Sequence, residues 1–479
     1  MPSFLPALIV ALDVVIAVAA SVHVVLNKSD TRGATSWVGL IWLVPILGAV
    51  LYVLLGINRI ERSARVRRPA AEEAGKRAGA RAWLPVDVDR ELGDEHMRLV
   101  DLAHVVDKVT QRPLLGGNHV ELLVDGDEAY PAMLAAIRAA RQSISLVSYI
   151  FEAGGVGGEF VEALAHAARH GVEVRVLIDD VGTRYSRPRI HRALRKRGVR
   201  VATFQPAFLP RSFAHINLRN HCKILVVDGR VGFTGGMNIR QGCVLASNPK
   251  QPTRDVHFRV RGPVVNQLQE SFARDWAFTT REELGGIAWF PELESQGAAL
   301  ARGIVDGPDQ HIDRQHWVLL AALGAARRSI RIMTPYFLPD RVLTQALHLA
   351  AHRGVEVDIV VPEVGNLAVV RWAMWGHHRQ VLQHGVRLWL SPPPFDHSKL
   401  IVVDGDWSSV GSSNWDPRSL RLNFEFNIEC YDEELGASLE AHVQARLRDA
   451  RLLTIEELDR RSLFQRIRDG SARLAKPYL

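Results

Sequence analysis

Two segments of the chain hold the same residue types at the same spacing: a His, a Lys two residues later and an Asp five residues after the Lys. They are HCKILVVD, with His221, Lys223 and Asp228, and HSKLIVVD, with His397, Lys399 and Asp404. An Asn, Asn238 or Asn414, follows each His after 17 residues. One such pattern would arise by chance in roughly 2% of chains of this composition. Two matching copies therefore indicate a built site.

These residue types suit phosphodiester chemistry. A histidine can attack phosphorus and form a covalent phosphohistidine. A second, protonated histidine can donate to the leaving alkoxide and later accept the proton of the incoming alcohol. Lysine ammonium groups and asparagine N–H groups can stabilise charge on the non-bridging oxygens. The chemistry requires no metal and no cofactor, and the residues alone leave open which histidine is the nucleophile.

The lysines of the two motifs stand out because the chain otherwise prefers arginine. Only 8 of its 59 basic residues are lysines, and two of these lie in the motifs. A lysine is a compact point charge, whereas arginine is a planar fork. The choice of lysine here indicates that the site needs a compact ammonium group.

Both motifs run into a predicted strand, KILVVD or KLIVVD, that ends in an Asp-Gly turn signal. Side chains alternate along a strand, so each His shares a face with the Lys of its own motif. Asp228 and Asp404 have the opposite parity and lie at the turn. We therefore expect the two aspartates to complete the catalytic motif by organising the strand end, without touching substrate.

Small residues follow each predicted turn, in GFTGGMN and SSVGSSN. Because glycine lets a backbone approach a ligand closely, we expect both returns to bind the substrate phosphate together with Asn238 and Asn414. The small residues assigned to this role are Gly235, Gly236, Gly411 and Ser412.

The elements around the motifs are predicted to be a duplicated α/β fold. Residues 140–151, ARQSISLVSYIF, match residues 326–337, ARRSIRIMTPYF, and residues 169–180 match 352–363 in the same order. Short β-branched runs alternate with helical stretches in both halves. Two α/β repeats are therefore expected to supply one half-site each to a single cleft.

The N-terminal part is predicted to lie in a membrane. Residues 4–26 and 36–57 are each long and apolar enough to cross the bilayer as a helix. A cleaved secretory signal fits less well, because the start lacks a positive region. Eight Lys and Arg against three Glu between residues 59 and 81 place that segment, and the large domain, on the cytoplasmic side.

Composition agrees with a globular chain that has an anionic partner, and it does not choose between a membrane surface and nucleic acid. The 479 residues are 47% hydrophobic and carry a net charge of +7, which excludes a disordered protein and suits an anionic partner. Residues 446–476 hold nine Lys and Arg among scattered apolar residues. They are predicted either to lie on the bilayer as a basic amphipathic helix or to pack on the domain with a solvated Arg face.

The paired motifs resemble those of the phospholipase D superfamily, and the whole chain resembles the bacterial cardiolipin synthases. Residues 35–60, 254–276 and 411–427 are similar to landmarks of that family. The resemblance implies phosphatidyl transfer between two phosphatidylglycerols, giving cardiolipin and glycerol. It also implies that His221 is the nucleophile and His397 the acid and base, with Glu425 and Asp255 as supporting carboxylates that orient the histidines. Alternatively, either carboxylate is an ordinary salt-bridge residue.

Two departures from the family pattern bear on substrate identity. Residues 240–247 read RQGCVLAS where an acidic-aromatic stretch is expected, and Thr253 stands in place of a common Trp. A membrane-anchored phospholipase D that uses water, or a lipid-binding scaffold with a relict site, therefore remains as an alternative. A nuclease is disfavoured by the two predicted spans.

The expected organisation and partners follow from these patterns together. We expect a multi-pass protein of the bacterial inner membrane that binds phosphatidylglycerol as donor and acceptor, with anionic headgroups at its basic segments and no nucleic acid. The predicted parts are a transmembrane hairpin (1–58), a basic linker (59–83), two phospholipase D-like repeats (84–300 and 301–445) and a basic C-terminal segment (446–479).

Overall fold

The computed structural model describes residues 4–28, 31–56, 86–93, 97–204, 219–308 and 312–476. The chain divides into two compact units, an N-terminal unit and a larger unit that holds both motifs. We describe each unit by itself. The predicted basic linker, residues 59–83, lies outside the described residues.

The N-terminal unit begins with helix α1 (Phe4–Asn27), which is long and apolar enough to cross a membrane. The second predicted span, residues 36–57, is not one helix. It consists of most of α2 (Thr31–Leu43), α3 (Pro45–Leu51) and the π-helix η1 (Tyr52–Gly56).

The chain turns back between α2 and α3. Val44 has φ −141° and ψ 78°, outside the helical region, and Pro45 supplies no backbone N–H. A Cβ on Gly48 would lie 2.6 Å from the Leu40 carbonyl oxygen, although eight residues of straight helix span about 12 Å. The apolar run that predicted a second crossing is therefore folded against itself and against α1, where the Tyr52 hydroxyl lies 2.8 Å from His23 Nδ1.

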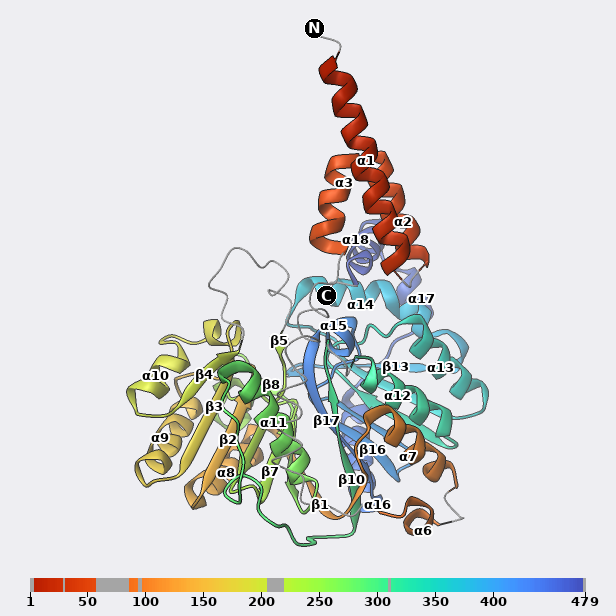
Figure 1. The fold of residues 1–479 in the computed structure, drawn as a ribbon. Helices are drawn as coiled ribbons and strands as arrows, with labels where there is room; N and C mark the ends of the chain where they lie inside the picture. Colours follow the sequence, from red (N-terminus) through yellow and green to blue (C-terminus); the bar gives the residue numbers. More distant parts are fainter. Residues whose placement is uncertain are drawn as a thin grey trace. The chain divides into compact units, whose positions relative to one another are not determined.

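The larger unit is built on one continuous sheet, to which both halves contribute the same strand order (Figure 1). The first half runs β1-β9-β7-β6-β2-β3-β4 and the second β10-β17-β16-β15-β11-β12-β13. The first set is β1 (Leu115–Val124), β2 (Ser143–Ser148), β3 (Glu173–Asp179), β4 (Val201–Phe204), β6 (Ile224–Val227), β7 (Val231–Gly235) and β9 (Val256–Arg261). The second set is β10 (Ala299–Asp306), β11 (Ser329–Met333), β12 (Glu356–Pro362), β13 (Arg387–Ser391), β15 (Leu400–Val403), β16 (Trp407–Gly411) and β17 (Asn423–Tyr431).

The strand register repeats as well. Ile144 on β2 is opposite Val227 on β6, and Ile330 on β11 is opposite Val403 on β15. Strands β2, β3 and β4 are parallel in the first half, as are β11, β12 and β13 in the second. The hairpin that follows each motif histidine is antiparallel. The halves join where β1 pairs antiparallel with β10. The α/β duplication expected from the sequence is therefore present.

Helices cover both faces of this sheet. In the first half they are α8 (Asp125–Ala139), α9 (Val156–Arg169), α10 (Ile190–Lys196) and α11 (Val265–Thr280). In the second half they are α12 (Arg314–Ala325), α13 (Arg341–His352), α14 (Ala368–Val381), α15 (Pro417–Arg421) and α16 (Glu433–Asp449). Each half has its own core, because apolar faces of helices pack against buried β-branched strands.

The predicted boundary of the first repeat differs from the packing. Helices α6 (Val88–Leu92) and α7 (Met97–Thr110) precede β1 and fall within the predicted 84–300 repeat. Nevertheless, Leu102 and Val106 of α7 belong to the same buried cluster as Val318 and Leu319 of α12 in the second half. An amphipathic helix buries its apolar face on whichever partner lies beside it, and here the partner is the other repeat.

The C-terminal segment is not a single helix. After α16 come strand β18 (Arg451–Leu452), which pairs with β13, and helices α17 (Ile455–Asp459) and α18 (Leu463–Leu474). Helix α18 packs against α14. Three further short strands, β5 (Arg219–Asn220), β8 (Thr253–Arg254) and β14 (Phe395–Asp396), lie beside the motifs.

Candidate active site

The first motif histidine is held against the second half of the chain. Strand β5, just before His221, pairs with the start of β17, and the His221 amide donates to the Phe424 carbonyl at 2.9 Å. This pairing brings His221 Nδ1 to 3.0 Å from both carboxylate oxygens of Glu425. Glu425 is fully buried and also accepts hydrogen bonds from Ser412 Oγ and Asn423 Nδ2.

The second motif histidine is held against the first half in the equivalent way. Strand β14 pairs with β8, and the His397 amide donates to the Arg254 carbonyl at 2.7 Å. His397 Nδ1 lies 2.7 Å from Asp255 Oδ2. Each histidine is therefore oriented by a carboxylate from the other repeat, and neither pair can form from one repeat alone.

Both histidines line a single cavity of about 220 Å³. Asn238, Asn414 and Asp255 line it as well. Both departures from the family pattern lie here too: Arg240 and Cys243 of residues 240–247, and Thr253, contribute to the wall. The two half-sites that the spacing predicted thus meet in one cavity of the larger unit.

The two lysines lie beside the histidines but do not line the cavity. Lys223 and Lys399 are buried, and each donates its ammonium group to the backbone carbonyl of the His in its own motif. Burial lowers the pKa of Lys223 to about 7 and the pKa of Lys399 to about 8. A phosphate that enters the cavity would favour the charged form of both groups.

The motif aspartates organise the backbone. Asp228 accepts hydrogen bonds from the amides of Arg141, Gln142 and Ser143. Asp404 does the same for the amides of residues 327–329 in the second half. Both aspartates adopt a positive φ at the turn, 50° and 55°. They do not line the cavity, and they tie the hairpin that follows each His to the preceding parallel strand.

The small residues expected to bind phosphate have other roles. Gly235 and Gly411 allow close packing against the neighbouring strand, where a Cβ would overlap Val256 or Asn427. A Cβ at Gly236 would overlap the Asp255 carboxylate, and the Ser412 hydroxyl is donated to Glu425. None of these four residues lines the cavity. The direct phosphate contact predicted for them is therefore corrected: Gly235 and Gly411 serve strand packing, and Gly236 and Ser412 lie against the two carboxylates.

The asparagines line the cavity but already have partners. Asn238 Oδ1 accepts from the Ile150 amide at 2.9 Å, which leaves its NH₂ group available to a ligand. Asn414 Nδ2 donates to Ser419 Oγ at 3.2 Å. Asn238 is thus ready to donate to a phosphate, and Asn414 keeps a second N–H for the same role, because an NH₂ group has two donors.

Several cavity residues were not predicted. Tyr149 packs edge-on against His221 with ring centroids 5.2 Å apart, and Tyr336 packs on His397 at 6.4 Å. Both tyrosines follow the carboxyl end of a parallel strand, where α/β sheets usually place ligand contacts, so this signal was available. Three arginines also line the cavity, namely Arg219, Arg240 and Arg418. Arg219 lies in β5 and Arg418 in α15, and neither belongs to the His-Lys-Asp motifs.

The two histidine–carboxylate pairs differ in what surrounds Nδ1. His221 Nδ1 has only carboxylate oxygens within reach, so it donates and Nε2 keeps a lone pair. His397 Nδ1 lies 2.9 Å from the Lys399 ammonium as well as beside Asp255. An ammonium can only donate. The neutral tautomer in which Nδ1 of His397 accepts from Lys399 therefore carries its proton on Nε2.

The pKa values of the two carboxylates also differ, raised in Asp255 and lowered in Glu425. Burial raises the pKa of Asp255 to about 8. Burial also opposes ionisation of Glu425, but the charge and hydrogen bond of His221 outweigh it, so the pKa of Glu425 lies below its usual value. Burial lowers the pKa of His221 to about 4 and that of His397 well below its usual value. Near neutral pH the His397–Asp255 pair thus holds one more proton than the His221–Glu425 pair.

Comparison with known proteins identifies the family. Residues 133–276 and 319–447 match the family model described as "Cardiolipin synthase, PLD-like domain", and residues 15–56 match one described as "Phospholipase_D-nuclease N-terminal". The chain belongs to the cardiolipin synthase family of phospholipase D-like proteins. Within the described ranges we find no group of three or more His, Cys, Asp and Glu residues that could hold a metal ion.

Similar proteins extend over nearly the whole chain. Cardiolipin synthase A of Pseudomonas aeruginosa is 33% identical over 479 residues, which is 100% of this chain and 96% of that protein. A cardiolipin synthase of Listeria monocytogenes is 30% identical over 468 residues, 96% of each chain. The crystal structure of phosphatidylserine synthase from Haemophilus influenzae superposes with a TM-score of 0.62 at 15% identity, over 79% of this chain and all of that one. The structural likeness supports the fold.

Proposed function

We propose that this protein is a cardiolipin synthase that transfers a phosphatidyl group from one phosphatidylglycerol to another, giving cardiolipin and glycerol. The observation that carries the mechanism is the opposite surroundings of the two Nδ1 atoms in one cavity. One histidine offers a lone pair and the other offers a proton. These are the two groups that a phosphohistidine mechanism needs. The relatives named cardiolipin synthase support the choice of reaction.

In the first step His221 Nε2 attacks the phosphorus of the donor lipid. The bond between phosphorus and the glycerol headgroup oxygen breaks, and that oxygen takes the proton from His397 Nε2. A proton moves to His397 Nδ1 from the Asp255 side as this occurs. The imidazolium of the phosphatidyl-His221 intermediate is stabilised by ionised Glu425, which lies 3.0 Å from Nδ1.

In the second step the terminal hydroxyl of another phosphatidylglycerol attacks the same phosphorus. His397 Nε2 takes the hydroxyl proton, the His221–phosphorus bond breaks, and cardiolipin forms. The acceptor brings a second phosphate into the cavity, and the three lining arginines supply cations for it. Arg240 belongs to the stretch that departs from the family pattern; it pairs with Glu152, and its charge also acts on His397.

The reaction is tested with purified full-length protein in phosphatidylglycerol bilayers, followed by lipid mass spectrometry. Cardiolipin and glycerol in equal amounts, absent with His221→Ala and with His397→Ala, are expected. Phosphatidic acid without cardiolipin would mean that water is the acceptor and that the protein is a phospholipase D. No turnover of phosphatidylglycerol or phosphatidylethanolamine would favour a lipid-binding scaffold.

We further propose that the N-terminal unit anchors the protein in the bacterial inner membrane with the catalytic domain on the cytoplasmic side. The basic residues between 59 and 81 support this side. In this arrangement α1 crosses the bilayer, and α2 and α3 enter and leave on one side, replacing the predicted second crossing. The turn suits lipid because Pro45 has no N–H and both Val44 backbone groups are hydrogen-bonded. Lys28 and Arg32 then lie on the cytoplasmic side as well.

A further inference from the structure

Helix α18 carries an exposed apolar face. Leu463, Phe464, Ile467 and Leu474 are 71%, 75%, 59% and 78% exposed. At 100° per residue, these four side chains fall within an arc of about 100° around the helix axis. A soluble domain rarely leaves so many large apolar side chains together in water, so this face indicates a binding surface.

The orientation of α18 is fixed by its other face. Asp469 and Ala472 are buried, and the Asp469 carbonyl oxygen lies 2.5 Å from the position of a Cβ on Gly376 of α14. The Asp469 carboxylate pairs with Arg461 and Arg468. The apolar face is therefore held outward by specific packing of a well-anchored helix.

The two helices are also joined by stacked arginines. The Arg468 guanidinium lies 4.8 Å from the ring centroid of Trp372, and that of Arg461 lies 4.2 Å from Trp375. These cation–π contacts cover the α14 tryptophans. Trp372 and Trp375 are thus covered, and the outer surface belongs to α18.

Basic residues border the apolar face. Arg466 and Arg473 lie along one side of the arc and Arg468 along the other. An apolar stripe flanked by arginines is typical of a helix that lies in the interface of an anionic bilayer. The same arginines disfavour a second copy of this helix as the partner, because two such faces would bring like charges together.

The α14–α18 pair extends to the catalytic cavity. Leu367 and Val370, at the start of α14, line the cavity, and Leu367 is 50% exposed. At the other end, Lys476 follows α18 and donates to the carbonyl of Pro339, next to the cavity residue Leu338. Both ends of the α14–α18 pair therefore reach the cavity wall.

We propose that the outer face of α18 seats the catalytic domain on the surface of an anionic phospholipid bilayer, so that acyl chains pass along α14 into the cavity. This rests on the proposed lipid substrate. It adds a docking surface separate from the N-terminal anchor. The anchor keeps the chain in the membrane, whereas α18 sets how the cavity faces the lipid.

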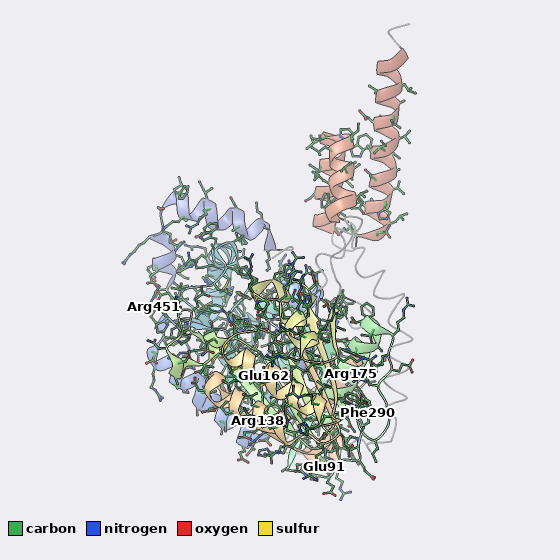
Figure 2. All side chains as sticks on the ribbon, turned by 90° about the vertical axis from the view of Figure 1, so that its left-hand side faces the viewer. Glu91, Arg138, Glu162, Arg175, Phe290 and Arg451 are labelled. Atoms are coloured by element: carbon green, nitrogen blue, oxygen red, sulfur yellow. The ribbon has the colours of Figure 1, made fainter. Side chains whose placement is uncertain are left out.

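The seating is measured in full-length protein reconstituted in phosphatidylglycerol vesicles. An environment-sensitive fluorophore on Phe464→Cys should shift to the blue and be quenched by brominated lipid, more strongly than in phosphatidylcholine vesicles. The three native cysteines are buried, and unsubstituted protein gives the labelling background. Arg138→Cys is the matched control, because Arg138 is exposed on helix α8, which lies at the end of the unit away from α18 (Figure 1 and Figure 2). A water-exposed label at both positions would overturn the proposal.

Activity gives a second, independent readout. Combining Leu463→Ser, Phe464→Ser and Ile467→Ser should lower turnover on phosphatidylglycerol vesicles roughly tenfold. Turnover of a soluble p-nitrophenyl phosphodiester should stay unchanged, which shows that the variant is folded. Ile287→Ser, at a residue 74% exposed outside α18, should change neither. Unchanged vesicle turnover, or dimerisation through α18, would reject the proposal. If the unsubstituted protein does not turn over the soluble phosphodiester at all, the proposed chemistry is rejected instead.

Discussion

At the scale of single residues, the two active-site histidines have the same motif but different neighbours. Ser412 donates to Glu425, whereas the equivalent residue Gly236 leaves Asp255 without a hydroxyl donor. Lys399 reaches His397 Nδ1, whereas Lys223 bonds only the His221 backbone. These differences of a few atoms support a nucleophile at His221 and an acid at His397.

A substrate with a good leaving group separates these roles. p-Nitrophenolate departs without a proton, so His397→Ala should still release a burst of p-nitrophenol from a p-nitrophenyl phosphodiester and then stall as a covalent adduct. His221→Ala should give no burst, because it lacks the nucleophile. Stopped-flow absorbance with acid-quenched peptide mass spectrometry measures both. A burst in His221→Ala and none in His397→Ala would reverse the assignment.

The pH dependence follows from the buried cations and from Asp255. The pKa values of Lys223 and Lys399 are lowered by burial to about 7 and about 8, so both ammonium groups are charged below this range and neutral above it. Burial raises the pKa of Asp255 to about 8, so its proton is also lost as the pH rises. kcat/KM for a soluble phosphodiester should therefore fall as the pH increases through 7 to 9, by more than about tenfold per unit above pH 8, because three protons are then being lost.

A matched measurement of kcat tests whether bound phosphate shifts this fall. Bound phosphate favours the charged lysines, so the fall in kcat should begin at higher pH than the fall in kcat/KM. A profile that is flat or that rises across this range would contradict a requirement for charged lysines and protonated Asp255 in the reaction.

At the scale of elements, the hairpin that carries each motif is held by one carboxylate. Asp228 caps three consecutive amides at the start of β2, and Asp404 repeats this at β11. The strands and this turn could be predicted from the sequence because they depend on alternation and an Asp-Gly signal within a few residues. The carboxylate partners of the histidines were suggested only through family resemblance, since they lie across the repeat boundary.

Removing this carboxylate should cost stability. Asp228→Ala leaves three amides without their acceptor, and we expect the free energy of unfolding to fall by about 3 kcal/mol. Urea or thermal denaturation followed by circular dichroism measures the loss. Asp101→Ala, at an exposed position on α7, is the control and should change stability by less than about 0.5 kcal/mol. Equal stability of both variants would mean that water replaces the carboxylate.

Other elements could not be predicted because they depend on distant packing. The amphipathic pattern of α7 predicts a buried face but does not name α12 of the other repeat as its partner. The apolar run after residue 36 has the length of a span, yet Pro45 and close packing at Gly48 turn it back. The spacing predicts ligand contacts for the glycines after each motif, but glycine also serves close strand packing. Spacing alone does not separate the two uses.

At the scale of the whole molecule, the N-terminal unit determines on which side the chain begins. If α1 alone crosses the bilayer, residue 3 lies outside the cytoplasm and the catalytic domain lies inside. In inside-out vesicles, a membrane-impermeant maleimide should label Arg138→Cys but not Ser3→Cys, and in intact spheroplasts the pattern should reverse. The buried native cysteines give little background. Labelling of both positions from the cytoplasmic side would mean that the chain crosses the bilayer twice, as the sequence predicts.

The exchange of carboxylates between the repeats has a consequence for how such a site can specialise. If each repeat were a separate chain, two identical copies would have to form two identical histidine–carboxylate pairs. Joining the copies in one chain removes that symmetry, because each half can then be substituted alone. Glu425 with Ser412 and Asp255 with Gly236 are the result here. Covalent linkage thus allows an attacking half and a proton-donating half to be inherited as one gene product.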